Sequence, residues 1–251
     1  MSCVNIRGRC IGEGRPKVIL PIVERTETAI LEKAAQFSTL RADCVEWRVD
    51  LFEGFLDAAA IARCVQKLRV ALRDKLLLVT FRTKAEGGAQ ALSHTEYLAF
   101  LGLILDTDCA DLLDIEFFTA GADLPALVNQ VHSAGAAVVC SSHDFAKTPP
   151  RAELISRMVQ MQQAGADLPK LAVMPQSRTD VLELLAATAE MADLHPETPV
   201  ITMSMGALGA VSRLAGEVLG SAMTFANPGQ ASAPGQVPLD VVNEVLDALR
   251  L

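Results

Sequence analysis

The sequence of 251 residues is poor in aromatic side chains and has no excess of basic ones. It contains one Trp and one Tyr, and its 30 Asp and Glu outnumber its 22 Lys and Arg, so the formal net charge is −8. Nucleic-acid-binding proteins usually present a basic face and aromatic groups that stack on bases. The composition therefore argues against a nucleic-acid partner and favours an enzyme that acts on a small molecule.

Long apolar runs are also missing. Although 51% of the residues are hydrophobic, no run approaches the roughly 18 residues that a membrane span needs. Residues 1–10 lack the apolar stretch of a signal peptide. We therefore expect a cytoplasmic protein with a sizeable core and no membrane partner.

Cysteine motifs are absent as well. The six cysteines are at positions 3, 10, 44, 64, 109 and 140, and no Cys-x-x-Cys occurs. We interpret them as reduced core thiols and not as a disulfide framework or a zinc site. Cys140 and His143 have the spacing of metal ligands, but one such pair cannot hold zinc alone. We therefore expect no metal site.

The sequence does contain a regular succession of apolar, β-branched runs, which predict eight strands. The predicted strands are Val18–Val23, Cys44–Val49, Leu76–Arg82, Leu112–Phe117, Ala137–Ser142, Lys170–Met174, Val200–Met205 and Ser221–Phe225. Most gaps hold apolar residues at helical spacing, as in Ala58–Val70, Thr95–Asp106, Leu124–Ala134, Ala152–Ala164, Thr179–Ala192 and Gly209–Leu219, and Leu239–Leu251 predicts a closing helix. Eight successive βα units predict a (β/α)8 TIM barrel.

The alternative fold is a doubly wound open sheet, but no Gly-x-Gly-x-x-Gly follows the first strand. Before that strand, Val4–Cys10 is predicted to form a β-hairpin that turns at Gly8 and closes the lower end of the barrel. No repeat, linker or charge block divides the chain. We therefore expect a single domain over residues 1–251.

Lys170 carries the most information about function. It lies in an apolar run with a proline near each end, Leu168–Pro175. Lys is seldom buried, and a buried ammonium group tends to lose its proton. The neutral amine is a nucleophile that condenses with ketones and aldehydes. The alternative is a lysine at the start of its strand whose side chain reaches solvent.

Further charged residues lie on the predicted second and fourth strands. Side chains alternate along a strand, so Glu46 and Arg48 share the lumen face while Trp47 takes the other. The pair is predicted to contact a substrate, or alternatively to form an ion pair that closes the barrel mouth. Asp114 and Glu116 share one face of their strand, where we expect them to support the groups that touch a substrate.

Two more candidates follow predicted strand ends, on the face where barrel enzymes carry their active sites. Arg82 ends the third strand, and Glu86 lies in the loop after it, beside Gly87 and Gly88, which allow the backbone a close approach. His143 comes just past the fifth strand, where a general acid or base belongs. Lys and His together suit imine chemistry with proton transfer.

The last two units complete the predicted pocket. Met203 and Met205 share one face and form an apolar wall with Phe225, and Arg213 lies early in the next helical region. The Gly- and Pro-rich segment Asn227–Gln236 follows the eighth strand and is predicted to be a lid, or alternatively a plain surface loop.

Seven short segments, in order across nearly the whole chain, now resemble a known family, the type I 3-dehydroquinate dehydratases of the shikimate pathway. The segments are Glu46–Asp50, Phe81–Arg82 with Glu86–Gly88, Ser142–Phe145, Pro169–Pro175, Met203–Met205, Ser212–Gly216 and Ser232–Gln236. The resemblance implies a (β/α)8 barrel that is usually a homodimer and needs no metal or cofactor.

Roles follow from the resemblance residue by residue. Lys170 is expected to form a Schiff base with the ketone of 3-dehydroquinate, and His143 to remove a proton beside the imine and later protonate the departing hydroxyl. Glu86 is expected to orient His143. Substrate contacts are expected from Arg213 to the carboxylate, from Ser232 and Gln236 in the lid, and from Glu46, Arg48 and Arg82 to the ring hydroxyls.

Two other classes of function are alternatives. A class I aldolase also uses a Schiff-base lysine, but its substrates are usually phosphorylated, and a phosphate cradle is then expected after strands seven and eight. That region instead has Arg213 and Ser232–Gln236, which suit a carboxylate. A barrel kept only for binding is expected to lack Lys170, His143 or Glu86, and all three are present.

Overall fold

A ring of parallel strands forms the centre of the protein in a computed structural model that describes residues 2–229 and 233–251. The strands are β3 (Lys17–Ile22), β4 (Cys44–Arg48), β5 (Leu76–Thr80), β6 (Leu112–Glu116), β7 (Ala137–Asp144), β8 (Leu168–Val173), β9 (Ile201–Ser204) and β10 (Met223–Asn227). From β3 to β9 each strand pairs with the next in chain order, and β10 pairs with β3. A bridge between Val200 and Ser221 joins β9 to β10. The predicted eight-stranded barrel is confirmed.

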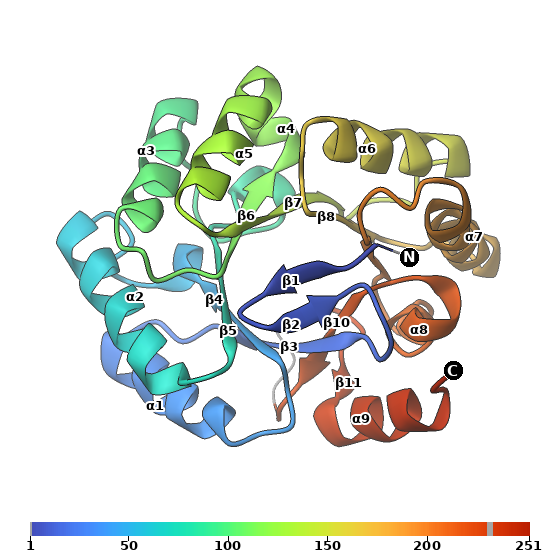
Figure 1. Ribbon diagram of the computed structural model, residues 1–251, viewed down its shortest axis with the longest axis horizontal. Helices are drawn as coiled ribbons and strands as arrows, with labels where there is room; N and C mark the ends of the chain where they lie inside the picture. Colours follow the sequence, from blue (N-terminus) through green and yellow to red (C-terminus); the bar gives the residue numbers. More distant parts are fainter. Residues whose placement is uncertain (1, 230–232) are drawn as a thin grey trace.

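Helices surround the ring on all sides (Figure 1). They are α1 (Glu27–Ser38), α2 (Ala58–Leu72), α3 (His94–Leu105), α4 (Phe117–Ala120), α5 (Leu124–Ser133), α6 (Arg151–Gln163), α7 (Arg178–Leu194), α8 (Gly216–Leu219) and α9 (Leu239–Ala248). Local sequence sets several starts; Ser93 with Glu96 and Ser177 with Asp180 form capping boxes for α3 and α7. None of the helices in the described ranges is long and apolar enough to span a membrane.

The prediction of one helix over Gly209–Leu219 is wrong. A 3-10 turn, η4 (Ala210–Arg213), and the four-residue α8 replace it. The hydroxyl of Ser212 donates to the carbonyl of Gly209 at 2.7 Å, and the backbone N–H of Ser204 donates to that hydroxyl at 2.9 Å. These bonds hold the segment against the end of β9 and turn the Arg213 side chain into the barrel.

Side chains alternate between two apolar layers along each strand. Leu76 and Leu78 face the lumen, whereas Leu77 and Val79 pack outward against the helices. On β4 the buried Trp47 faces outward and packs against Phe52, with ring centroids 5.8 Å apart. The predicted division of this strand is confirmed, because its charged residues line the lumen instead.

An N-terminal hairpin of β1 (Val4–Ile6) and β2 (Arg9–Ile11) lies across the amino-terminal end of the barrel (Figure 1). It turns at Gly8, whose φ of 77° suits glycine, and the amide of Gly8 donates to Asn5 Oδ1 at 3.0 Å. Ile6 and Ile11 are buried against the lumen side chains. The predicted closure of the barrel base is confirmed.

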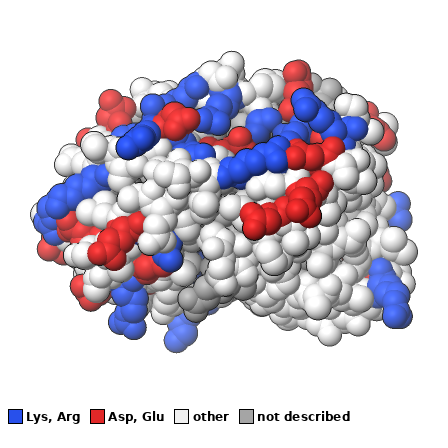
Figure 2. All heavy atoms as spheres, turned by 90° about the horizontal axis from the view of Figure 1, so that it is seen from below, with Lys and Arg blue, Asp and Glu red and all other residues white. Residues whose placement is uncertain are grey.

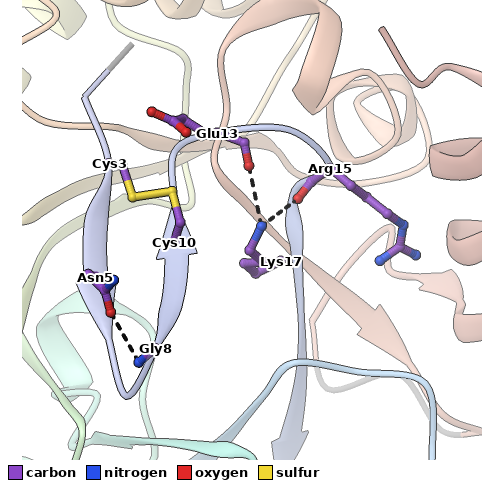
Figure 3. Close-up of a disulfide and its surroundings, with 7 residues drawn as sticks. All are labelled: Cys3, Asn5, Gly8, Cys10, Glu13, Arg15 and Lys17. Carbon is purple, nitrogen blue, oxygen red and sulfur yellow. Dashed lines mark hydrogen bonds between the residues drawn. A yellow bond between two sulfur atoms is a disulfide. The ribbon is translucent and has the colours of Figure 1, made fainter.

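Two cysteines depart from the prediction. Cys3 and Cys10 form a disulfide across the hairpin (Figure 3), so the expectation of reduced core thiols is wrong for this pair. The reason is the antiparallel pairing of β1 with β2, which places the two Cα atoms 5.5 Å apart. The other four cysteines are free, and Cys44, Cys64 and Cys140 are buried.

Candidate active site

A cavity of 430 Å³ lies at the carboxyl ends of the barrel strands. Every predicted site residue in the described ranges lines it; these are Glu46, Arg48, Arg82, Glu86, His143, Lys170, Met203, Met205, Arg213, Phe225 and Gln236. Ser232 lies outside the described residues. Phe145, Ala233 and Pro234 also line the cavity and belong to the segments that carry the family resemblance, whereas the prediction missed Leu51 and Ala89, which are apolar and lie outside those segments.

Lys170 is the third residue of β8, because the strand begins at Leu168 and not at Lys170 as predicted. Its side chain is 3% exposed, which excludes the alternative of a lysine that reaches solvent. The ammonium group donates to Asp114 Oδ2 at 3.3 Å and lies 4.9 Å from the centre of the Phe225 ring. Ala172, two residues on, is a small side chain that leaves room above the lysine.

His143 lies on β7, which continues to Asp144, and therefore inside the strand rather than just past it. Its Nδ1 is 2.8 Å from Glu86 Oε2, and the same oxygen accepts the backbone N–H of His143 at 3.0 Å. We assign the ring proton to Nδ1, because Glu86 Oε2 acts as an acceptor toward the backbone N–H of His143 and can accept the ring N–H in the same way. The other ring nitrogen, Nε2, is then unprotonated and can act as a base.

The surroundings set the charge of this pair. Burial lowers the pKa of His143 well below its usual value, and the cations Arg82, Lys170 and Arg48 lower it further. Burial also raises the pKa of Glu86 to about 8, against the opposing effect of Arg82. The imidazole is therefore neutral at neutral pH, as a proton acceptor must be.

Arg82 is the hub of a buried charge network. Its Nη1 donates to Glu116 Oε1 at 2.8 Å and Ser141 Oγ at 3.0 Å, and its Nη2 donates to Asp114 Oδ1 at 2.9 Å. Burial disfavours the ionised form of Asp114, but Arg82 and Lys170 outweigh it and lower the pKa of that carboxyl. Asp114 and Glu116 therefore support the lysine and the arginine, as predicted from their shared face.

Two glycines allow the wall beside Glu86 to form. A side chain at Gly88 would place its Cβ 1.8 Å from the carbonyl oxygen of Arg82, and one at Gly87 would lie 2.3 Å from the Phe145 ring. Gly87 also has φ of 85°, in the left-handed region. The predicted close approach of backbone is present, and it brings Glu86 to His143.

The charged pair on β4 does not form an ion pair with itself. Glu46 Oε1 accepts the hydroxyl of Thr80 at 2.9 Å, whereas Arg48 binds Asp50 through two hydrogen bonds. The alternative of a Glu46–Arg48 pair at the mouth is wrong. Both side chains line the cavity with their charges directed to different partners.

Arg213 is a buried cation without a carboxylate partner in the described parts of the chain. It is 2% exposed, and burial lowers its pKa to about 10. Its Nη2 donates to the carbonyl of Pro234 at 3.1 Å, in the segment predicted to be a lid. An uncompensated buried charge is costly, so this position favours an anionic ligand.

Residues 233–236, the described end of the segment predicted to be a lid, reach the cavity on this side. Ala233, Pro234 and Gln236 line it, and the Pro234 carbonyl also accepts the N–H of Gly206 at 3.2 Å. Beyond it, β11 (Val237–Pro238) pairs in parallel with β10. No group of three or more His, Cys, Asp and Glu in residues 2–229 and 233–251 could hold a metal ion.

Comparison with known proteins agrees with this geometry. The family model for type I 3-dehydroquinase matches residues 18–251. The 3-dehydroquinate dehydratase of Bacillus subtilis is 47% identical over 99% of this chain and 98% of its own, and that of Salmonella agona is 42% identical over 99% of each.

Solved structures give the same result. The type I 3-dehydroquinate dehydratase of Clostridium difficile, with covalently modified comenic acid, has a TM-score of 0.96 at 41% identity and covers 99% of this chain and 98% of its own. The enzyme of Enterococcus faecalis has a TM-score of 0.93 at 40% identity, over 99% of this chain and 100% of its own. Matches of this extent and identity establish more than a shared fold, and the chain belongs to the type I 3-dehydroquinate dehydratase family of hydro-lyases.

Proposed function

We propose that the chain removes water from 3-dehydroquinate through a Schiff base on Lys170, with His143 moving the protons, to give 3-dehydroshikimate. The observation that supports this most is the burial of Lys170 within a lumen-facing strand, in a cavity that it shares with His143 and Arg213. An amine, a neutral imidazole and a guanidinium with no carboxylate partner among the described residues are the groups that a β-hydroxy ketone with a carboxylate requires.

The first step joins enzyme and substrate. The Lys170 amine, after losing a proton, attacks the ketone carbon, and the carbonyl oxygen leaves as water to give a protonated imine. This imine is an electron sink for the adjacent C–H bond. His143 Nε2 takes the proton from that carbon, the electron pair forms an enamine, and the imidazole becomes an imidazolium.

The second step expels the hydroxyl group. Electrons from the enamine break the C–O bond, and the imidazolium returns its proton to the leaving oxygen, so that one His serves both transfers. Such acid–base assistance contributes roughly 10²–10⁴-fold. Water then hydrolyses the conjugated imine and restores the Lys170 amine, so the net change is loss of one water.

Binding groups surround this chemistry. Arg213 is proposed to hold the carboxylate, because the ligand would supply the counter-charge that the guanidinium lacks among the described residues. The ring hydroxyls are proposed to meet Glu46, Arg48 and Arg82 at the other end of the cavity. Gln236 is proposed to act with Ser232 in closing the lid over the substrate.

The covalent step is tested by borohydride reduction. Purified protein incubated with 3-dehydroquinate and borohydride should gain a stable adduct on the peptide that contains Lys170, and ultraviolet absorbance should show the conjugated product without the reductant. Protein treated without substrate, and the Lys170→Met variant, are the controls. An active enzyme with Lys170 unmodified under these conditions would contradict the mechanism.

We further propose that the chain works in the cytoplasm as a homodimer of single barrel domains, without metal or cofactor, as the family resemblance implies. Light scattering should then give twice the chain mass of 26.8 kDa. Thermal unfolding should be one transition, and chelators should leave turnover unchanged. A monomeric mass at working concentration would contradict the dimer.

A further inference from the structure

Asp50 is a buried carboxylate behind the cavity wall. It lies in η1 (Val49–Leu51), the 3-10 turn that ends β4, and is completely inaccessible to solvent. Its Oδ1 accepts Arg48 Nε at 2.7 Å and the backbone N–H of Arg82 at 3.3 Å. Its Oδ2 accepts Arg48 Nη2 at 2.8 Å and the backbone N–H of Ala89 at 3.0 Å. Each oxygen therefore binds two N–H groups.

The three residues that donate to Asp50 all line the cavity, although they come from different segments. Arg48 ends β4, Arg82 follows β5, and Ala89 follows the two glycines of the next loop. Glu86, the partner of His143, lies between Arg82 and Ala89. One carboxylate thus fixes a guanidinium in the cavity and both ends of the loop that carries Glu86.

The bidentate bond also decides how Arg48 faces a ligand. It occupies the Nε–Nη2 edge of the planar guanidinium, so the end of the plane at Nη1 is the part that remains for the cavity. Arg48 is 17% exposed on its side chain and stands on a long, flexible stem. Without its two hydrogen bonds to Asp50, the Arg48 side chain is not held in one rotamer. A misplacement of its guanidinium by about 1 Å can lower the rate about 10²-fold.

We propose that Asp50 is a positioning residue of the dehydration reaction, which holds the Arg48 guanidinium and the Glu86 loop in the geometry that the substrate requires. This rests on the proposed function, in which Arg48 meets the ring hydroxyls. Asp50 does not touch the substrate, because its oxygens are fully occupied and it does not line the cavity. Its effect on the substrate passes through Arg48 and through the loop that carries Glu86.

Asp111 provides a matched comparison. It lies beside the start of β5, whereas Asp50 lies beside its end. Asp111 too accepts an arginine, Arg69, and a backbone N–H, that of Leu77 in β5 at 2.7 Å. Neither of these partners lines the cavity. Asp111 therefore makes the same kind of tie, but one that serves the fold alone.

The test is a double-mutant cycle on Asp50→Asn and Arg48→Ala, with Asp111→Asn as the control. Asparagine keeps the volume, but its amide nitrogen faces an N–H donor and cannot accept it. We expect Asp50→Asn to lower kcat/KM by about 10- to 100-fold, mainly through KM, and to weaken binding of the alcohol analogue of the substrate, which cannot form an imine. In the Arg48→Ala background the same change should have a clearly smaller effect, limited to the part that passes through the loop that carries Glu86.

The control variant separates positioning from folding. Asp111→Asn should lower the melting temperature and leave kcat/KM unchanged. Additive losses in the cycle, or an Asp50→Asn enzyme within about twofold of the parent in kcat/KM and analogue binding, would overturn the proposal. If Asp50→Asn fails to fold, Arg48→Lys tests the same fork and should weaken analogue binding, whereas unchanged binding would count against it. Failure of the proposed function would show differently, as absence of product from the parent enzyme.

Discussion

The two ends of the barrel use the same charged residue types in opposite surroundings. At the base, ion pairs such as Arg9–Asp43, Arg41–Asp247 and Arg15–Asp247 lie at the surface. Figure 2 shows charges of both signs densest toward its upper part, the side of the hairpin, and few over much of its lower right. At the mouth, Arg82 and its carboxylates are buried beside the cavity.

The base charges follow a repeated local pattern. Asp43, Asp111 and Asp167 each directly precede a strand, and each accepts a backbone N–H at the start of the strand before it, from Val18, Leu77 and Val138 at 2.7–2.9 Å. Each also contacts a basic side chain, from Arg9, Arg69 and His132. These carboxylates tie neighbouring strands together.

The free-energy cost of losing a charged partner depends on whether the pair is exposed or buried. Exposed pairs contribute about 0–1 kcal/mol each, so the base tolerates the loss of one. Removing one partner from a buried network leaves an uncompensated charge, which costs about 3–5 kcal/mol. We infer that the buried network at the mouth positions groups for the reaction. The ion pairs at the base connect parts of the fold.

The largest contrast is expected between two lysines. Lys170→Met removes the amine at nearly constant length, and turnover should fall by about 10⁴-fold or more, as for other nucleophile deletions. At the base, Lys75 Nζ donates to the carbonyls of Leu40 and Ala42 at 2.8 and 2.6 Å. Lys75→Met should lower the melting temperature and leave kcat/KM unchanged. Steady-state rates and thermal unfolding of both variants check the pair, and residual turnover in Lys170→Met above about a hundredth of the parent would contradict the role.

Two histidines give the next contrast. His143→Ala should still form the borohydride-trapped adduct but lose about 10²–10⁴-fold in turnover, because both proton transfers lose their carrier. At the base, Nε2 of the exposed His132 lies 2.8 Å from Asp167 Oδ2. His132→Ala should therefore leave turnover as it is. Equal activity losses in the two variants would remove the distinction between the ends.

The lid and the hairpin are expected to respond differently to a ligand. Binding of the alcohol analogue should slow hydrogen exchange of the amides in 233–237, since this segment lines the cavity, and Gln236→Ala should weaken that binding about tenfold. The disulfide-linked hairpin should exchange equally in both states. Strong, unchanged protection of the lid segment would mean that it does not move.

The smallest effect is a pH dependence of opposite sign at the two ends. Burial raises the pKa of Glu86 to about 8, so its contribution to stability is fully present below its ordinary pKa of 4.5 and is lost as pH rises from there to about 8. The hydrogen bond from Arg41 lowers the pKa of Asp247, whose contribution is present at neutral pH and is lost as pH falls.

Melting temperatures of two neutral variants measure this difference. Relative to the parent, Glu86→Gln should gain a few °C as pH rises from about 5 to about 8. Asp247→Asn should be less stable than the parent at neutral pH, with the gap closing as pH falls. Parallel curves for Glu86→Gln and the parent would show that the carboxyl titrates normally.

Sequence periodicity predicts the barrel and the lumen face well. The alternation of β4 and β9 placed Glu46, Arg48, Met203 and Met205 correctly, because the backbone alone sets which side a strand residue takes. Strand ends were less accurate. Lys170 and His143 lie deeper in β8 and β7 than predicted, since pairing with neighbouring strands extends both.

Features set by tertiary contact were not predictable in the same way. The Cys3–Cys10 bond depends on hairpin register, and the broken helix at Gly209–Leu219 depends on contacts with the end of β9. In the sequence, Asp50 was noted only as the last residue of the segment Glu46–Asp50, without a role of its own. Its role depends on a 3-10 turn, which strand alternation does not describe, and on loop amides that come from elsewhere in the chain.

The outward-facing Trp47 has an optical consequence. It is the chain's one tryptophan, and it lies between Glu46 and Arg48 on β4. Its indole N–H is buried with no hydrogen-bond partner among the described residues, in an apolar layer against Phe52. Its emission should therefore be blue-shifted in the folded protein and move to longer wavelength when water reaches the ring. The chain thus carries a single intrinsic fluorophore, one residue from two cavity-lining side chains.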